Sequence, residues 1–406
     1  MTLNQKVKNS GLFLFSILLV SCVIYSFGNF GLLNLFHIKL EVQIALVFLL
    51  TSFLILANLI FFKQNIKNIL FLFVLYFILS ALIVNDIHNA IHMIISLIFV
   101  GAILSLNESK IDLVIKAIIL FSGIFALLGT IQFIILQFDF DNVRLLDYSF
   151  FSGNPYINIE SKTSLNYLGF VNWYDGIRLE NIFGIEYARS RSFASEPSVL
   201  VVIIFIPAIL SLLYNKFYRA IGYFVLFYSL FIVYAGVMHL SVIFSVFIFL
   251  IAFMFSNKYR IYILYLVIFI VMLIVLVNLP LLFSYLPENK IGSGMARLTF
   301  LHDIISSFLS NPFTTIDSKN YPVGIFLSSM RVLPFVGFLM SIILFHKLFK
   351  KIFYLLHNNV LFFSLLGGTM FQAFIFSAYG WITLPGFILL ALIYTKLNLI
   401  YLDIRH

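Results

Sequence analysis

The chain has 406 residues, of which 62% are hydrophobic and only 10% charged, and its mean hydropathy is +1.09. Soluble globular proteins are about 45–50% apolar and about 25% charged, so this composition excludes a protein that folds in water. The formal net charge of +9 would suggest a nucleic-acid partner in a soluble protein. In a membrane protein basic residues report topology first, and we expect no nucleic-acid partner.

Apolar stretches long enough to cross a bilayer recur along the whole chain. They predict an all-α polytopic membrane protein that forms a single integral membrane domain, residues 1–406. About twelve spans are expected, near 11–30, 42–62, 68–84, 89–106, 113–138, 197–214, 219–236, 239–256, 261–284, 325–346, 360–378 and 382–402. The first contains Cys22 in LLVSC, which is similar to a lipoprotein cleavage box. Because the apolar run continues past it, we interpret this stretch as an uncleaved span.

Lysines and arginines gather in the short connections on one side of the predicted bundle. That side carries Lys6, Lys8, Lys63, Lys67, Lys110, Lys216, Arg219, Lys258, Arg260, Lys347, Lys350 and Lys351. The short connections on the other side contribute only Lys39. Short cytoplasmic loops are enriched in such residues, so both termini are expected in the cytoplasm.

Two longer segments, about 139–196 and 285–324, fall on the outer side of this topology. Together they hold eleven of the sixteen acidic residues. We expect them to form larger loops that carry short interfacial helices. The polar chemistry of the chain is therefore concentrated in two places on one face of the membrane.

The end of the first loop, residues 188–203, places charges directly against an apolar run. Ser195 suits a helix cap, and Glu196 and Pro197 suit the first turn of a helix. Helix geometry does not explain Arg189 and Arg191. Either these arginines extend to lipid phosphates, or they form an anion site, since paired guanidinium groups match a diphosphate.

The second loop contains an apolar stripe at helical spacing, followed by Asn311-Pro312, which stops a helix. The stripe consists of Leu298, Leu301, Ile304, Ile305 and Phe308. It predicts an amphipathic helix over about 295–312 that lies in the membrane interface. Arg297 and His302 on this helix are either interfacial polar residues or groups that contact a substrate. His239, expected in a tight outer turn, is either a turn residue or a member of the same site.

Several familiar chemistries leave no trace in the sequence. It contains no phosphate-binding glycine loop, no Cys/His metal array and no nucleophile elbow. We therefore expect neither a metal nor a cofactor. The predicted span interiors are almost free of ionisable side chains, which argues against an ion-coupled transporter.

Two segments resemble one family. RSFASEPS, residues 191–198, is similar to the arginine, small residue, Glu-Pro motif of the bacterial O-antigen polymerase (Wzy-type) and O-antigen ligase superfamily. Residues 294–324 resemble the second large periplasmic loop of that family, and VLPFVGFLMSIILF the span that follows. The motif similarity covers about 188–345. His302 matches the histidine-bearing loop of the ligases only weakly, which favours a polymerase.

The resemblance implies a metal-independent glycosyl transfer on the periplasmic face of the bacterial inner membrane. Donor and acceptor would both be undecaprenyl-diphosphate-linked glycans, with membrane lipid around them and a flippase and a chain-length regulator as protein partners. Two alternatives stay open. A ligase would transfer finished glycan to lipid A core, and a flippase or other transporter would perform no chemistry.

Within this resemblance each candidate residue has an expected role. Arg191 and Arg297 would clamp the diphosphate from the two loops, and Arg189 would assist. Glu196 would orient an arginine or act as base towards the acceptor hydroxyl. His302 is a further candidate catalytic residue, and the other candidate substrate contacts are His239 and Arg178.

Overall fold

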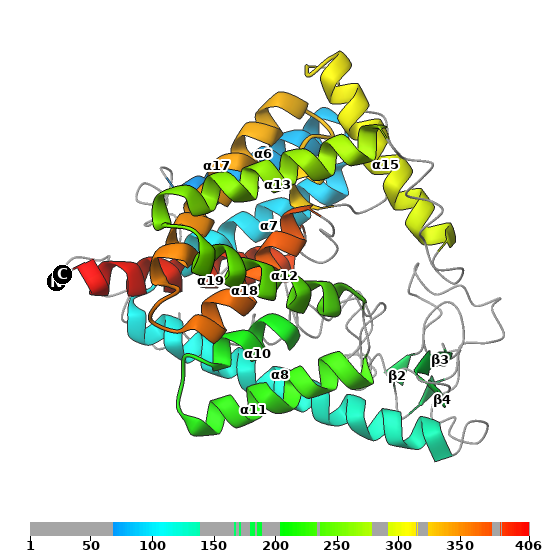
Figure 1. Ribbon diagram of the computed structural model, residues 1–406, viewed down its shortest axis with the longest axis vertical. Helices are drawn as coiled ribbons and strands as arrows, with labels where there is room; N and C mark the ends of the chain where they lie inside the picture. The colour runs from blue at the N-terminus through cyan, green and yellow to red at the C-terminus, as the bar shows by residue number, and fades with distance from the viewer. Residues whose placement is uncertain are drawn as a thin grey trace. The chain divides into compact units, whose positions relative to one another are not determined.

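The computed structural model describes part of the chain as defined helices, strands and turns (Figure 1). The described residues are 68–138, 166–167, 170–171, 179–182, 185–188, 204–233, 236–277, 291–313, 315, 324–375, 382 and 384–405. The predicted spans at 11–30 and 42–62 lie outside them. The chain forms two compact units: Met1–Phe62 with Ser105–His239, and Lys63–Leu104 with Leu240–His406. The expectation of a single integral membrane domain stays a prediction.

In the first unit, one long helix packs against two shorter ones. The elements are α8 (Glu108–Phe138), α10 (Ile206–Ser211), α11 (Lys216–Phe227) and a π-helical turn, η4 (Tyr228–Ile232). Gly129 of α8 lies directly under the ring of Tyr228, where a Cβ would overlap the phenol. Gly222 similarly admits the hydroxyl of Ser211. Small residues at these crossings let the helices approach closely.

The connection between α10 and α11 is anchored to the start of α8. The hydroxyl of Tyr214 donates a hydrogen bond of 2.8 Å to Asp112 Oδ1. Lys116 Nζ lies 5.4 Å and 5.8 Å from the ring centroids of Tyr214 and Tyr218, within the range of a cation–π interaction. Polar contacts thus hold the connection between α10 and α11 against the first turns of α8.

Described residues of the first predicted loop form strands rather than an interfacial helix. β1 (Asn166–Tyr167) pairs with β2 (Phe170–Val171), and β3 (Leu179–Ile182) pairs antiparallel with β4 (Ile185–Ala188). Only two residues, Phe183 and Gly184, separate β3 from β4 in the sequence, a length typical of hairpins. The described part of this loop therefore contains strands and not the predicted helix.

The second unit is a bundle of helices around a phenylalanine core. Its helices are α6 (Ile69–Ile83), α7 (Ile87–Leu104), α12 (Gly236–Met254), α13 (Asn257–Val277), α15 (Ile291–Ser310), α16 (Ile325–Ser329), α17 (Pro334–Leu355), α18 (Val360–Ile375) and α19 (Leu384–Arg405). Residues 236–239, at the start of α12, belong to the first unit. The ring of Phe345 on α17 lies 4.2 Å from that of Phe349 and 5.3 Å from those of Phe326 and Phe374, centroid to centroid. These contacts join α16, α17 and α18.

Among the described residues, four helices are long and apolar enough to cross a membrane: Glu108–Ile131, Val237–Met254, Asn257–Ile274 and Gly386–Ile404. They agree with the expectation of a helical membrane protein. The predicted span at 325–346, in contrast, is not one helix. It divides into α16 and α17, and Pro334 is the first residue of α17. Proline lacks the N–H that a continuous helix requires, which accounts for the break.

Candidate functional site

The best-described candidate site lies where α15 crosses α13 and α16. Leu301, Ile304 and Ile305 of α15 are buried, and the ring of Phe308 lies 5.2 Å from that of Phe338 on α17. The helix ends just before Asn311-Pro312. The helix and these contacts agree with the predicted stripe at Leu301, Ile304, Ile305 and Phe308, whereas the side chain of Leu298 lies outside the described residues. Its place at the membrane interface stays a prediction.

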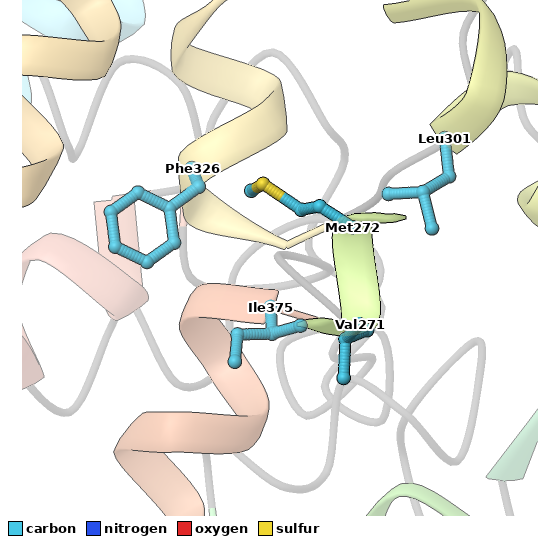
Figure 2. Close-up of a pocket in the computed structure, with 5 residues that line it drawn as sticks. All are labelled: Val271, Met272, Leu301, Phe326 and Ile375. Atoms are coloured by element: carbon cyan, nitrogen blue, oxygen red, sulfur yellow. The ribbon is translucent and has the colours of Figure 1, made fainter. Parts of the chain in front are cut away.

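A small apolar cavity marks the contact between α15 and the bundle. It is lined by Val271 and Met272 of α13, Leu301 of α15, Phe326 of α16 and Ile375 of α18 (Figure 2). The cavity volume is about 10 Å³, near the minimum that holds one water molecule. It is therefore a packing gap under α15 and has no room for a sugar or a diphosphate.

The predicted site residues fall into two groups. Four lie outside the described residues: Arg178, Arg189, Arg191 and Glu196. Arg297 and His302 both lie on α15, where only the backbone of Arg297 is described. His302 is half-exposed, and its Nδ1 lies 3.3 Å from Asp303 Oδ1. Whether the arginines of the two loops meet stays a prediction.

His239 lies in the first turn of α12 and is half-buried. We expected it in a tight turn, whereas the structure starts a helix three residues before it. His239 belongs to the first unit and α15 to the second. A shared site for His239 and His302 therefore stays a prediction.

A buried hydroxyl network holds the break between α16 and α17. The hydroxyl of Tyr76 on α6 donates to the carbonyl oxygen of Ser329. Ser329 Oγ donates to Phe326 O at 2.7 Å, and Ser341 Oγ donates to Gly337 O at 2.9 Å. A Cβ on Gly337 would overlap Ser329 O. The carbonyl group of Ser329, the last residue of α16, is thus satisfied by a side chain from α6, as buried backbone requires.

The segment after α15 is fastened to the same break. Phe335 N donates to Pro312 O at 3.0 Å, and Thr315 Oγ1 donates to Val332 O at 3.0 Å. Arg331 lies in the turn between these contacts. The sequence did not single out Arg331, because one continuous span was expected over 325–346. Pro334 was the signal that could have exposed the break.

At the opposite end of α17, a lysine is packed against α19. Lys351 Nζ donates to Asn398 Oδ1 and lies 4.3 Å from the ring centroid of Tyr394. Burial, and to a lesser extent the charge of Lys347, lowers the pKa of Lys351 to about 8. In the sequence, Lys351 served only as a marker of topology. Its contacts show that it also joins two helices.

The lowered pKa of Lys351 predicts a pH dependence of stability. An unfolded lysine has a pKa of about 10.4, so between about pH 8 and 10.4 the unfolded state binds more protons than the folded state. Stability should therefore rise with pH across this window. We expect the Tm of wild type minus that of Lys351→Met to grow as the pH of detergent-purified protein rises from 7.5 to 10.5. Lys350→Met, at an exposed position, is the control, and parallel curves for wild type and Lys351→Met would contradict the assignment.

The described residues offer no metal site, since no three of their His, Cys, Asp or Glu side chains gather closely enough to hold an ion. The described helices of the candidate site carry polar and cationic groups instead. In comparisons with known proteins, no family model, no curated protein and no solved structure matches this chain.

Proposed function

We propose that this protein is a polymerase of undecaprenyl-diphosphate-linked oligosaccharide repeat units that makes O-antigen or a related surface polysaccharide. In this proposal it is a multi-pass protein of the bacterial inner membrane with about twelve spans. Both termini lie in the cytoplasm, and glycosyl transfer takes place on the periplasmic face. The reaction needs no metal or other cofactor.

The observation that carries the proposal is the arrangement of α15. Its apolar stripe packs on α13, α16 and α17, and its register places position 297 one helical turn before the buried Leu301. Cationic and polar residues, among them His302, thus lie along a helix attached to one end of an apolar bundle. A substrate with a hydrocarbon tail and a diphosphate head needs this combination of surfaces.

The chemistry requires charge neutralisation at the leaving group. The acceptor hydroxyl attacks the anomeric carbon of the donor, loses its proton to a base, and undecaprenyl diphosphate departs with the bonding electron pair. Arg191 and Arg297, assisted by Arg189, would neutralise that diphosphate. Glu196 would accept the proton or orient an arginine. His302, and more remotely His239 and Arg178, would contact the sugars.

The test is the length of the surface glycan in a strain that lacks this protein. We expect wild type to restore a ladder of repeats. Arg191→Ala and Arg297→Ala should leave a single repeat on its final carrier, because losing one preorganised cation costs about 100-fold or more in rate. Arg219→Ala, an arginine of the predicted cytoplasmic side, is the matched control and should restore the ladder. All variants are compared at equal amounts in the membrane.

Other outcomes distinguish the two alternatives. Undecaprenyl-linked polymer that forms without this protein but never reaches its acceptor identifies a ligase. Single repeats that accumulate on the cytoplasmic face identify a flippase. Full polymerisation by both arginine variants would contradict the diphosphate clamp.

A further inference from the structure

A line of polar and small residues runs along one face of α18, which is otherwise buried in apolar contacts. Ser364, Gly368 and Gln372 follow one another at intervals of four residues, so the helix aligns them on one side. At Gly368 the backbone of α18 lies directly on α12, where a Cβ would overlap the amide nitrogen and Oγ of Ser245. We use the name polar seam for the row of Ser364, Gly368 and Gln372 on α18, together with Ser241 and Ser245 of α12, against which Gly368 lies.

Two side chains of the polar seam are buried without hydrogen bonds. Gln372 has no exposed surface, and neither its Nε2 nor its Oε1 has a partner among the residues that the structure describes. Ser364 Oγ, on the other side of Gly368, is also buried and has no hydrogen-bond partner among the described residues. Their neighbours differ: Ser245 Oγ donates to Ser241 O at 2.6 Å, and Thr369 Oγ1 donates to Leu365 O at 2.8 Å.

An amide in this position is costly to keep. A buried polar group without partners loses its hydration and gains nothing in return, and in a bilayer no surrounding solvent can help. A leucine or methionine of similar size would fill the same space without that penalty. The presence of glutamine therefore points to a ligand for its amide.

We propose that Gln372 binds a hydroxyl group in the polar seam. The amide presents a donor, Nε2, beside an acceptor, Oε1. A hydroxyl complements both, because it accepts one hydrogen bond and donates another. A carboxylate can only accept and an ammonium can only donate, so either would leave half of the amide unpaired. The hydroxyl comes from a bound water molecule or from a sugar of the glycan substrate, and the second source rests on the proposed function.

Gln372 lies close to one end of α18. It lies three residues before the end of α18, and Ile375 at that end lines the cavity under α15. Gly324, next to α16, packs against the carbonyl group of Phe374. The polar seam thus ends beside the helix that carries His302 and Arg297.

The experiment measures the Tm of the full-length protein in detergent and the kinetics of polymerisation with a lipid-linked repeat unit. The variants are Gln372→Leu and the unbranched Gln372→Met, so that a folding defect in one leaves the other. Thr369→Val is the control, since it removes a buried hydroxyl of α18 that is already paired. If water occupies the seam, both Gln372 variants lower the Tm and leave the KM unchanged.

If the hydroxyl belongs to the glycan, the Gln372 variants raise the Tm of the free protein by about 2 °C. They then also raise the KM for the repeat unit by about tenfold, the factor for one lost hydrogen bond. A raised Tm with unchanged kinetics would overturn the proposal. If wild type shows no polymerase activity, the proposed function fails and the Tm of the Gln372 variants alone tests the site. A Tm below that of wild type supports bound water. A Tm above that of wild type overturns the hydroxyl site.

Discussion

Replacing Gly337 by alanine should unfold the protein at a Tm about 5 °C below that of wild type. The new methyl group would overlap the carbonyl oxygen of Ser329 and crowd the hydroxyl of Tyr76. The first of these is backbone, so relief requires α16 to move away from α17. We expect overpacking at this position to cost about 3 kcal/mol. The measurement is thermal unfolding of purified protein in detergent.

Gly367→Ala provides the matched control for Gly337→Ala. A Cβ at Gly367 would lie 3.0 Å from Cγ2 of Ile248, the end of a side chain that can shift. This variant should unfold close to wild type. Equal Tm values for the two alanine variants would contradict the close packing at the break between α16 and α17.

Replacing Arg260 by alanine should have an effect of similar size. Arg260 is 5% exposed, and its guanidinium group joins the ends of two helices. It donates to Phe255 O at 2.8 Å, to Ala252 O at 2.7 Å and, more weakly at 3.4 Å, to Phe353 O. Its removal leaves these carbonyl groups unpaired at the ends of α12 and α17, which costs about 3 kcal/mol.

Arg219→Ala is the control for Arg260→Ala. Arg219 is exposed and also donates to a carbonyl oxygen, that of Tyr214, at 2.7 Å. The two residues stand at equivalent places, just after the start of α11 and of α13. We expect Arg260→Ala to lower the Tm by about 5 °C and Arg219→Ala to leave it almost unchanged. Equal shifts would show that burial of Arg260 adds nothing to stability.

The sequence predicted best those features that depend on local patterns. The spacing of Leu301, Ile304, Ile305 and Phe308 predicted α15, because a helix with one apolar face must cover an apolar neighbour. Hydropathy predicted the helical class of the protein and the approximate bounds of most described helices. It failed at 325–346, where a single proline outweighs an otherwise continuous apolar run.

Features that depend on contacts between distant segments were beyond the sequence. Arg260 and Lys351 served only as topology markers in the sequence. Nothing in the adjacent sequence indicates that Phe353 and Asn398 are their partners. Gln372 attracted no notice because it carries no charge. Its importance comes from burial without partners, which is a property of the folded bundle. The two-loop arginine site remains a prediction from the sequence.

The hydrogen bond from Tyr76 to Ser329 also constrains how the protein is made. Its partners are 253 residues apart in the chain. At about 5–20 residues per second, the ribosome delivers the second partner roughly 10–50 s after the first. During that interval α6 carries a tyrosine hydroxyl whose final acceptor does not yet exist. The α6–α7 pair, which is already synthesised, has to hold its place in the membrane until α16, α17 and finally α19 arrive to complete the second unit.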